Sequence, residues 1–155
     1  MSNYKGFRGG FKQGIFTPTH PEKYKGKTPI VMRSSWEFAY ARWCDINKNV
    51  IEWGSESAVV PYFDVAHKKN RHYFIDFTMK IKDVHGVIHK YYIEIKPFAQ
   101  TVPPTKGPRK KNTTFMNECM TFATNVSKWK AATQFAKSKG AEFKILTEKE
   151  IMRYQ

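Results

Sequence analysis

The sequence predicts an α/β protein whose elements follow the order helix, strand, strand, strand, helix, strand. Two periodicities carry this prediction: apolar residues three or four positions apart indicate amphipathic helices, and alternation of apolar and polar residues indicates half-buried strands. In chain order the predicted elements are a helix at 34–46, a strand at 50–53 with 57–62 as its candidate continuation, strands at 72–82 and 87–96, a helix at 115–138, a strand at 142–147 and a short final helix opening at 147–150.

Both long helices have an apolar stripe and a recognisable end signal. In the first, apolar residues recur at helical spacing from Trp36 to Trp43. In the second they recur from Phe122 to Ala136, and Gly140 follows as the expected C-cap region. No second domain and no internal repeat is indicated, and a chain of 155 residues is long enough to bury one core.

A β-hairpin is predicted between residues 72 and 96. The odd positions from Tyr73 to Ile81 are all apolar, whereas the polar residues of that stretch occupy even positions. The loop Val84-His85-Gly86 has the length and the glycine of a common hairpin closure. Counting back along both strands from this loop places Asp76 opposite Glu94, with Cβ atoms about 4.5–5.5 Å apart.

This register brings the carboxylates of Asp76 and Glu94 together, with Lys96 two residues further along. Carboxylates bind Mg²⁺, and a neighbouring lysine can orient or activate water, as metal-dependent phosphodiester hydrolysis requires. The set contains no His or Cys, which favours Mg²⁺ or Mn²⁺ over Zn²⁺. The competing interpretation is a solvated sheet face on which Lys96 forms an ordinary ion pair. Opposed like charges destabilise a hairpin, however, and a bound cation removes that objection.

Glu37 is a third candidate carboxylate, on the first turn of the first predicted helix. Ser34 precedes it by three residues, which is also the spacing of a capping box. A structural cap and a metal ligand would compete for the same side chain. Both interpretations stay open from the residues alone.

Composition indicates a polyanionic partner and excludes several classes of protein. The net charge is +14 and the isoelectric point is near 9.8; the alternative is a basic protein that is merely soluble. The two cysteines, Cys44 and Cys119, have no paired spacing, and the five histidines do not cluster, so neither a disulfide framework nor a zinc site is expected. The chain lacks a long apolar window and a signal-peptide core, which predicts a soluble, unexported protein.

Two segments concentrate the positive charge. Residues 97–114 contain no acidic residue and are rich in proline and glycine, which predicts a mobile basic loop able to clamp DNA beside the metal site. Residues 1–29 combine aromatic residues, glycines and basic residues, and are predicted to form an irregular arm that grips nucleic acid or docks on a protein. The candidate DNA-binding residues of the two segments are Lys106, Arg109, Lys110, Lys111, Arg8 and Lys12.

An ordered set of motifs resembles the PD-(D/E)xK nuclease superfamily. It comprises Arg-Ser-x-Trp-Glu at 33–37, Phe-x-Asp-Phe at 74–77, Glu-x-Lys-Pro at 94–97, Ser-Glu with Pro-Tyr within 55–62, Lys-Trp-Lys-Ala-Ala at 128–132 and Phe-Lys-Ile-Leu-Thr-Glu at 143–148. The resemblance runs from about Tyr24 to the C-terminus. It is closest to the head-completion nucleases of T-even-like tailed phages, and more distant to the endonuclease subunits of heteromeric transposases. Ile75 departs from the family, which usually has proline at that position.

The resemblance implies a restriction-endonuclease-like αβββαβ core, with a small mixed sheet flanked by helices, in a nuclease domain at 30–155 that follows the basic arm at 1–29. By the same resemblance, Glu37, Asp76, Glu94 and the Ile95 carbonyl would hold Mg²⁺, with Mn²⁺ as a substitute, and Lys96 would position the attacking water. Glu56 is a weaker candidate ligand. Lys130 is either a phosphate contact or a solvated lysine.

The activity so implied is a DNA endonuclease that trims or processes packaged phage DNA during head completion. It would act on double-stranded DNA in the host cytoplasm, in association with the phage head, neck or connector and without a membrane. Two alternatives remain. One is a structural DNA-binding head or neck protein with a vestigial site, and the other is a transposase-type or junction-resolving nuclease.

Overall fold

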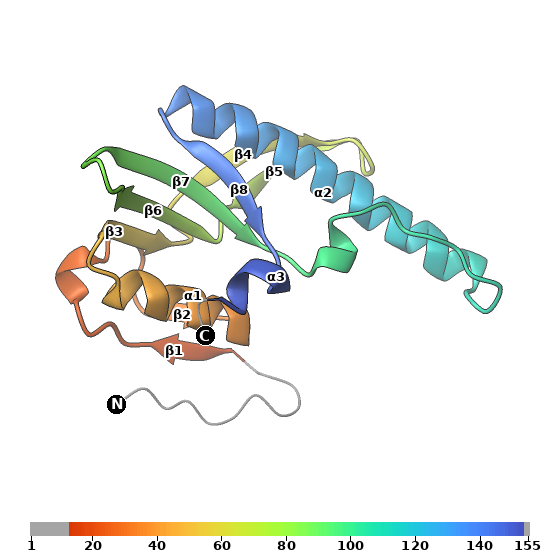
Figure 1. The fold of residues 1–155 in the computed structure, drawn as a ribbon. Coiled ribbons are helices and arrows are strands. Elements are labelled where there is room, and N and C mark those ends of the chain that lie inside the picture. The colour runs from red at the N-terminus through yellow and green to blue at the C-terminus, as the bar shows by residue number, and fades with distance from the viewer. Residues whose placement is uncertain (1–12, 154–155) are drawn as a thin grey trace.

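A four-stranded mixed sheet forms the centre of the computed structural model, which describes residues 13–153 (Figure 1). Its strand order is β3-β6-β7-β8. Strands β3 (Val50–Ser55), β6 (Phe77–Lys82) and β7 (Ile88–Ile95) are antiparallel, and β8 (Glu142–Leu146) is parallel to β7. With the helices α1 (Ser35–Ile46) and α2 (Asn112–Ser138), the core follows the predicted order αβββαβ.

The predicted hairpin register is confirmed between β6 and β7. Phe77 pairs with Ile93 and Met79 pairs with Tyr91. The Asp83 amide donates to the Val87 carbonyl at 2.8 Å, which closes the loop, and Gly86 has a φ of 79°, in the left-handed region that glycine adopts without strain.

The predicted single strand at 72–82 is wrong, because two strands occupy that segment. β5 (Lys69–Phe74) pairs with β4 (Val59–Asp64) in a separate hairpin, and β6 begins only at Phe77. Two backbone hydrogen bonds, from Glu56 to the Asp76 carbonyl (3.1 Å) and from Ile75 to the Ala58 carbonyl (3.0 Å), hold the chain between them. β3–β6 and β4–β5 therefore form one antiparallel ribbon that bends at Ile75 and Asp76.

The bend lets the ribbon contribute to two cores, one on each face of the central sheet. The first core lies between the sheet, α1 and the small β1–β2 ladder, and includes Phe16, Met32, Tyr40, Trp53, Phe77 and Ile93. The second lies between β7, the β4–β5 hairpin and α2, and includes Val60, Tyr62, Tyr73, Ile75, Tyr92, Ala132 and Ala136. The apolar residues before the bend, Tyr73 and Ile75, are therefore buried in the second core, whereas Phe77 and Met79, after the bend, are buried in the first.

The N-terminal half of α2 extends beyond the sheet (Figure 1). The segment before it contains a short 3-10 turn, η2 (Phe98–Gln100), followed by an irregular chain. This chain runs outward from the sheet, alongside the N-terminal half of α2, to the point where α2 begins. Lys110 fastens the two together, since its ammonium donates to the Thr105 carbonyl and to the Glu118 carboxylate, each at 2.7 Å. After α2, Gly140 has a φ of 68°, and the short helix α3 (Glu148–Ile151) begins with a capping box.

The described part of the predicted N-terminal arm, residues 13–29, packs against the core of the fold, in contrast to the irregular arm expected. β1 (Gly14–Phe16) pairs with β2 (Ile30–Met32), and a short 3-10 turn, η1 (Pro21–Lys23), lies between them. The ammonium of Lys23 donates to three carbonyls at the end of α1, those of Cys44, Asp45 and Asn47, at 2.7, 2.9 and 2.8 Å. Reciprocally, the buried Asp45 carboxylate accepts from the amides of Thr19 and His20, both at 2.8 Å.

Two further properties bear on the class of protein. Within residues 13–153, no helix is both long and apolar enough to cross a membrane. Cys44 is a buried free cysteine, whereas Cys119, expected to be buried as well, is a partly buried free cysteine.

We predict that Lys23→Met lowers the free energy of unfolding by about 1.5–3 kcal/mol, because it removes a charged donor from three carbonyls at a helix end, of which, within residues 13–153, only that of Asn47 keeps an amide donor, from Val50. The measurement is urea denaturation at neutral pH. Lys48→Met is the matched control, since Lys48 is an exposed lysine near the same helix end and should change stability little. Equal losses in the two variants would show that helix-dipole charge matters here and the three hydrogen bonds do not.

Candidate active site

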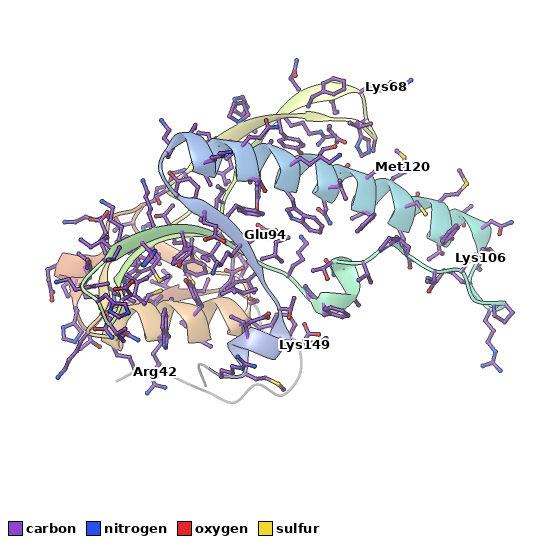
Figure 2. The ribbon with its side chains drawn as sticks, turned by 45° about the horizontal axis from the view of Figure 1, so that its top comes forward. Arg42, Lys68, Glu94, Lys106, Met120 and Lys149 are labelled. Carbon is purple, nitrogen blue, oxygen red and sulfur yellow. The ribbon has the colours of Figure 1, made fainter. Side chains whose placement is uncertain are left out.

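Three carboxylates from three elements come close enough to influence one another. Glu37 lies on the first turn of α1, Asp76 at the bend of the ribbon, and Glu94 near the end of β7. Burial raises the pKa of Asp76 well above its usual value, and the negative charges of Glu94 and Glu37 raise it further. Figure 2 shows Glu94 inside the body of the protein, between the sheet and α2.

Asp76 is positioned by a main-chain hydrogen bond from the neighbouring strand. Its Oδ2 accepts from the amide of Ile95 at 2.8 Å. In a strand, the amide and the carbonyl of one residue leave the backbone on the same side. The Ile95 carbonyl therefore faces the side on which Asp76 lies, as its predicted role as a ligand requires.

Glu94 is buried, with 6% of its surface exposed, and both its oxygens have partners. The Tyr73 hydroxyl donates to Oε2, and the Lys96 ammonium lies 3.6 Å from Oε1. Burial and the nearby Glu94 charge raise the pKa of Tyr73, so this hydroxyl stays protonated and remains a donor. The charge of Glu94 is thus held between a tyrosine from β5 and a lysine from its own strand.

Glu37 has a structural role at the start of α1, and its role as a metal ligand stays a prediction. Its backbone amide donates to Ser34 Oγ at 3.1 Å, which is the N-cap half of a capping box. Its Oε2, however, accepts from the amide of Arg33 at 2.7 Å, one residue before the cap. This bond fixes one oxygen and leaves the other available. Burial raises the pKa of Glu37, with the Arg33 amide acting in the opposite direction.

The donor set fits a hard divalent cation. It consists of carboxylate oxygens and one carbonyl, the ligands that Mg²⁺ and Mn²⁺ prefer. Burial, with the nearby negative charge of Glu94, raises the pKa of both Asp76 and Glu37, and a bound cation would favour their charged forms. As the side chains stand, no three His, Cys, Asp or Glu residues within residues 13–153 are grouped closely enough to enclose an ion. Oε2 of Glu94, Oε2 of Glu37 and Oδ2 of Asp76 are each occupied by a protein donor.

Several predicted residues lie elsewhere. The Glu56 carboxylate pairs with the Arg33 guanidinium, although its amide is bonded to the Asp76 carbonyl. Glu56 is also one of two non-glycine residues in the described chain with positive φ, at 51°. Lys130 is exposed on α2. Arg8 and Lys12 lie outside the described residues.

The basic residues of the predicted clamp lie away from the carboxylates. Figure 2 shows Lys106 at the outer end of the extension formed by α2 and its preceding segment, far from Glu94. Arg109 and Lys111 are exposed in the same segment, whereas Lys110 is paired with Glu118. The segment starts beside the candidate site at Pro97 and carries its charge outward from there.

Two residues at the site were not predicted. Tyr73 was interpreted only as a core residue, because its position in the apolar alternation gives no sign that its hydroxyl reaches Glu94. Lys128 was passed over in favour of Lys130, yet its ammonium lies 5.5 Å from the centroid of the Tyr73 ring. Helical spacing could have shown that Lys128 and Lys130 lie on different sides of the helix, since residues two positions apart point in different directions.

We predict that, without metal, Asp76→Asn is more stable than the wild-type protein at pH 7, because asparagine keeps an acceptor for the Ile95 amide and removes a buried charge. A carboxyl group with a raised pKa in the folded state stabilises the fold when protonated, and this contribution is lost as pH rises through the raised value. The melting temperature should rise by several degrees, with about 2–4 °C expected per kcal/mol at this chain length. The difference should shrink as pH falls toward 4. A difference independent of pH would contradict this account.

Comparison with known proteins agrees with the geometry. The model of the TnsA-like endonuclease N-terminal family matches residues 47–148, a segment that includes Asp76, Glu94 and Lys96. The head completion nuclease of Enterobacteria phage T4 is 44% identical over 141 residues, which are 87% of this chain and 90% of that protein. No solved structure matches the chain. The fold is a mixed sheet flanked by helices, with candidate carboxylates where the ribbon bends. Together with these two matches, it shows that the chain belongs to the TnsA-like endonuclease family.

Proposed function

We propose that this protein is a Mg²⁺-dependent DNA endonuclease that trims or processes packaged phage DNA during head completion. The observation that carries the proposal is the convergence of Glu37, Asp76 and Glu94 beside Lys96, in a chain of an endonuclease family. The similarity to a protein named head completion nuclease supports the biological setting.

In this proposal each residue has a separate role. The carboxylates of Asp76, Glu94 and Glu37 and the Ile95 carbonyl hold the cation. When bound, Mg²⁺ lowers the pKa of a coordinated water and stabilises charge on the phosphate. Lys96 orients the attacking water and stabilises the charge that develops on the phosphate oxygens. Tyr73 fixes the rotamer of Glu94 and therefore the direction of its Oε1.

The substrate in this proposal is double-stranded DNA, bound chiefly through its backbone. A net charge of +14 favours such contacts, and the exposed Lys106, Arg109 and Lys111 would meet the duplex at a distance from the cleaved phosphate. The sequence contains no base-reading helix motif, so we propose weak sequence preference. The protein would work in the host cytoplasm, at or near the phage head, neck or connector.

A second candidate is favoured by the family match itself, since the chain belongs with TnsA-like endonucleases. In that case the substrate would be a structured or sequence-defined site such as a transposon end or a junction. Comparing cleavage of random linear DNA with cleavage of branched DNA separates the two candidates.

We predict that Asp76→Asn, Glu94→Gln and Lys96→Ala each reduce cleavage by at least about 10²–10³-fold, because each removes a ligand or a donor to the developing charge. The measurement is nicking and linearisation of a supercoiled plasmid, with circular dichroism to confirm folding. Glu37→Gln should also lose activity if its free oxygen serves the metal. If Glu37 acts only at the helix end, the variant should keep full activity and lose about 1 kcal/mol of stability. Full activity in Asp76→Asn would end the metal-site proposal.

A metal series tests the identity of the cation. We expect Mg²⁺ and Mn²⁺ to support cleavage, Mn²⁺ with relaxed selectivity. Ca²⁺ should support DNA binding without cleavage, since its larger radius and looser coordination place water and phosphate poorly. EDTA should abolish cleavage while much of the salt-dependent DNA binding remains. Undiminished cleavage in EDTA would contradict the metal-site proposal, whereas DNA binding without cleavage in every metal would favour a structural DNA-binding head or neck protein.

A further inference from the structure

Helix α2 brings a second lysine to the candidate active site. Lys128 is half-buried on α2, and its ammonium lies 5.5 Å from the centroid of the Tyr73 ring on β5. The hydroxyl of the same tyrosine donates to Glu94 Oε2. Lys128 is therefore separated from the carboxylate cluster by a single side chain. Lys130, two residues further on, is exposed.

Lys128 has no counter-ion among the described residues. Three other partly buried lysines are paired: Lys96 lies 3.6 Å from Glu94, Lys80 lies 3.1 Å from Glu52, and Lys110 lies 2.7 Å from Glu118. Lys90, over the Tyr92 ring on the central sheet, resembles Lys128 in having an aromatic contact and no ion pair within the described chain. Lys128 instead lies over the face of the Tyr73 ring. The ring attracts the cation without neutralising its charge. The ammonium is thus held near Glu94 with its charge available to an external anion.

The charge balance of the site calls for such a cation. A phosphodiester is anionic, and the cluster that it must approach contains the carboxylates of Glu37, Asp76 and Glu94. Lys96 lies 3.6 Å from Oε1 of Glu94, and Lys128 lies over the ring of Tyr73, whose hydroxyl donates to Oε2. Lys96 therefore contacts the carboxylate itself, and Lys128, from another element, contacts the tyrosine that holds it.

We propose that the Lys128 ammonium binds a non-bridging oxygen of the DNA phosphate held at the carboxylate cluster, so that this phosphate lies between Lys96 and Lys128. The inference rests on the proposed function, because it names the residue that receives the substrate of that site. It makes Lys128 a catalytic residue, whereas Tyr73, which acts through Glu94, is a positioning residue.

The test compares Lys128→Met with Lys137→Met, an exposed lysine of the same helix nine residues away and on its opposite side. Affinity for a duplex is measured by fluorescence anisotropy at salt concentrations between about 50 and 200 mM, in Ca²⁺ and again in EDTA. Over this range, the dependence of affinity on salt reports the number of phosphate contacts. For Lys128→Met in Ca²⁺, the slope of log affinity against log salt should fall by about 0.9, as expected for one lost phosphate contact. Lys137→Met should leave the slope unchanged.

A second arm locates the contact on the DNA. Single phosphates are replaced, one position at a time, by neutral methylphosphonates. At one position, Lys128→Met and the neutral phosphate should weaken binding no further together than either does alone. If the wild-type protein cleaves, that position should be the cleaved one. If it does not cleave, the scan still identifies the contact, so failure of the proposed function is distinguishable from failure of this inference.

Lys128→Gln guards against a folding artefact, and both variants are checked by thermal melting. In cleavage assays, Lys128→Gln should lower kcat/KM by at least tenfold without changing the melting temperature. Equal salt slopes for Lys128→Met, Lys137→Met and the wild-type protein in both conditions would overturn the proposal. So would additive losses at every methylphosphonate position.

Discussion

The candidate site depends on a change of hydrogen-bonding direction at Ile75. In a regular strand, the Ile75 amide would point toward β7 and pair with Ile95, as Phe77 does with Ile93. Instead it donates to the Ala58 carbonyl on the other side. The Ile95 amide and carbonyl thereby lose their partner in the sheet. The Asp76 carboxylate takes the amide, and the carbonyl is left as a candidate ligand. One bend in a ribbon thus creates both an anchored carboxylate and an open main-chain oxygen.

The same bend explains how like charges can be buried together. Beyond it, β5 lies over the sheet, so that Tyr73 can reach Glu94, while α1 presents Glu37 from the opposite face. Each carboxylate has its own donor: the Ile95 amide, the Tyr73 hydroxyl or the Arg33 amide. These bonds hold the side chains in place, while burial and the charges of Glu94 and Glu37 still raise the pKa of Asp76. The arrangement costs stability in the absence of a cation, which is common at sites whose function requires that cation.

The sequence predicted the β6–β7 register because Gly86 fixed the loop and one register satisfied both the apolar faces and the carboxylates. It did not predict the β4–β5 hairpin, whose turn contains neither glycine nor proline. The turn is built instead by the buried Asp64, which accepts from the amides of Ala66 and His67 at 3.1 and 3.4 Å. Nor could the alternation show that Ile75 and Phe77 enter different cores, because both cores bury residues of the same parity. Long-range packing of this kind leaves no local signal.

The positive charges fall into two groups that the net charge alone does not distinguish: one on the extension, suited to binding DNA, and one near the candidate active site. Lys106, Arg109 and Lys111 lie on an extension away from Glu94, where they can contribute counterion release and orientation without affecting the chemical step. Lys96 lies beside Glu94, and Lys128 lies beside the Tyr73 ring, where a displacement of about 1 Å can cost activity. Helix α2 connects the two tasks, since its outer half carries the extension and its inner half carries Lys128 and the alanines packed on the sheet. In the proposed function, a duplex bound along the outer half would therefore be aligned by the same helix that carries Lys128, the residue proposed to contact the cleaved phosphate.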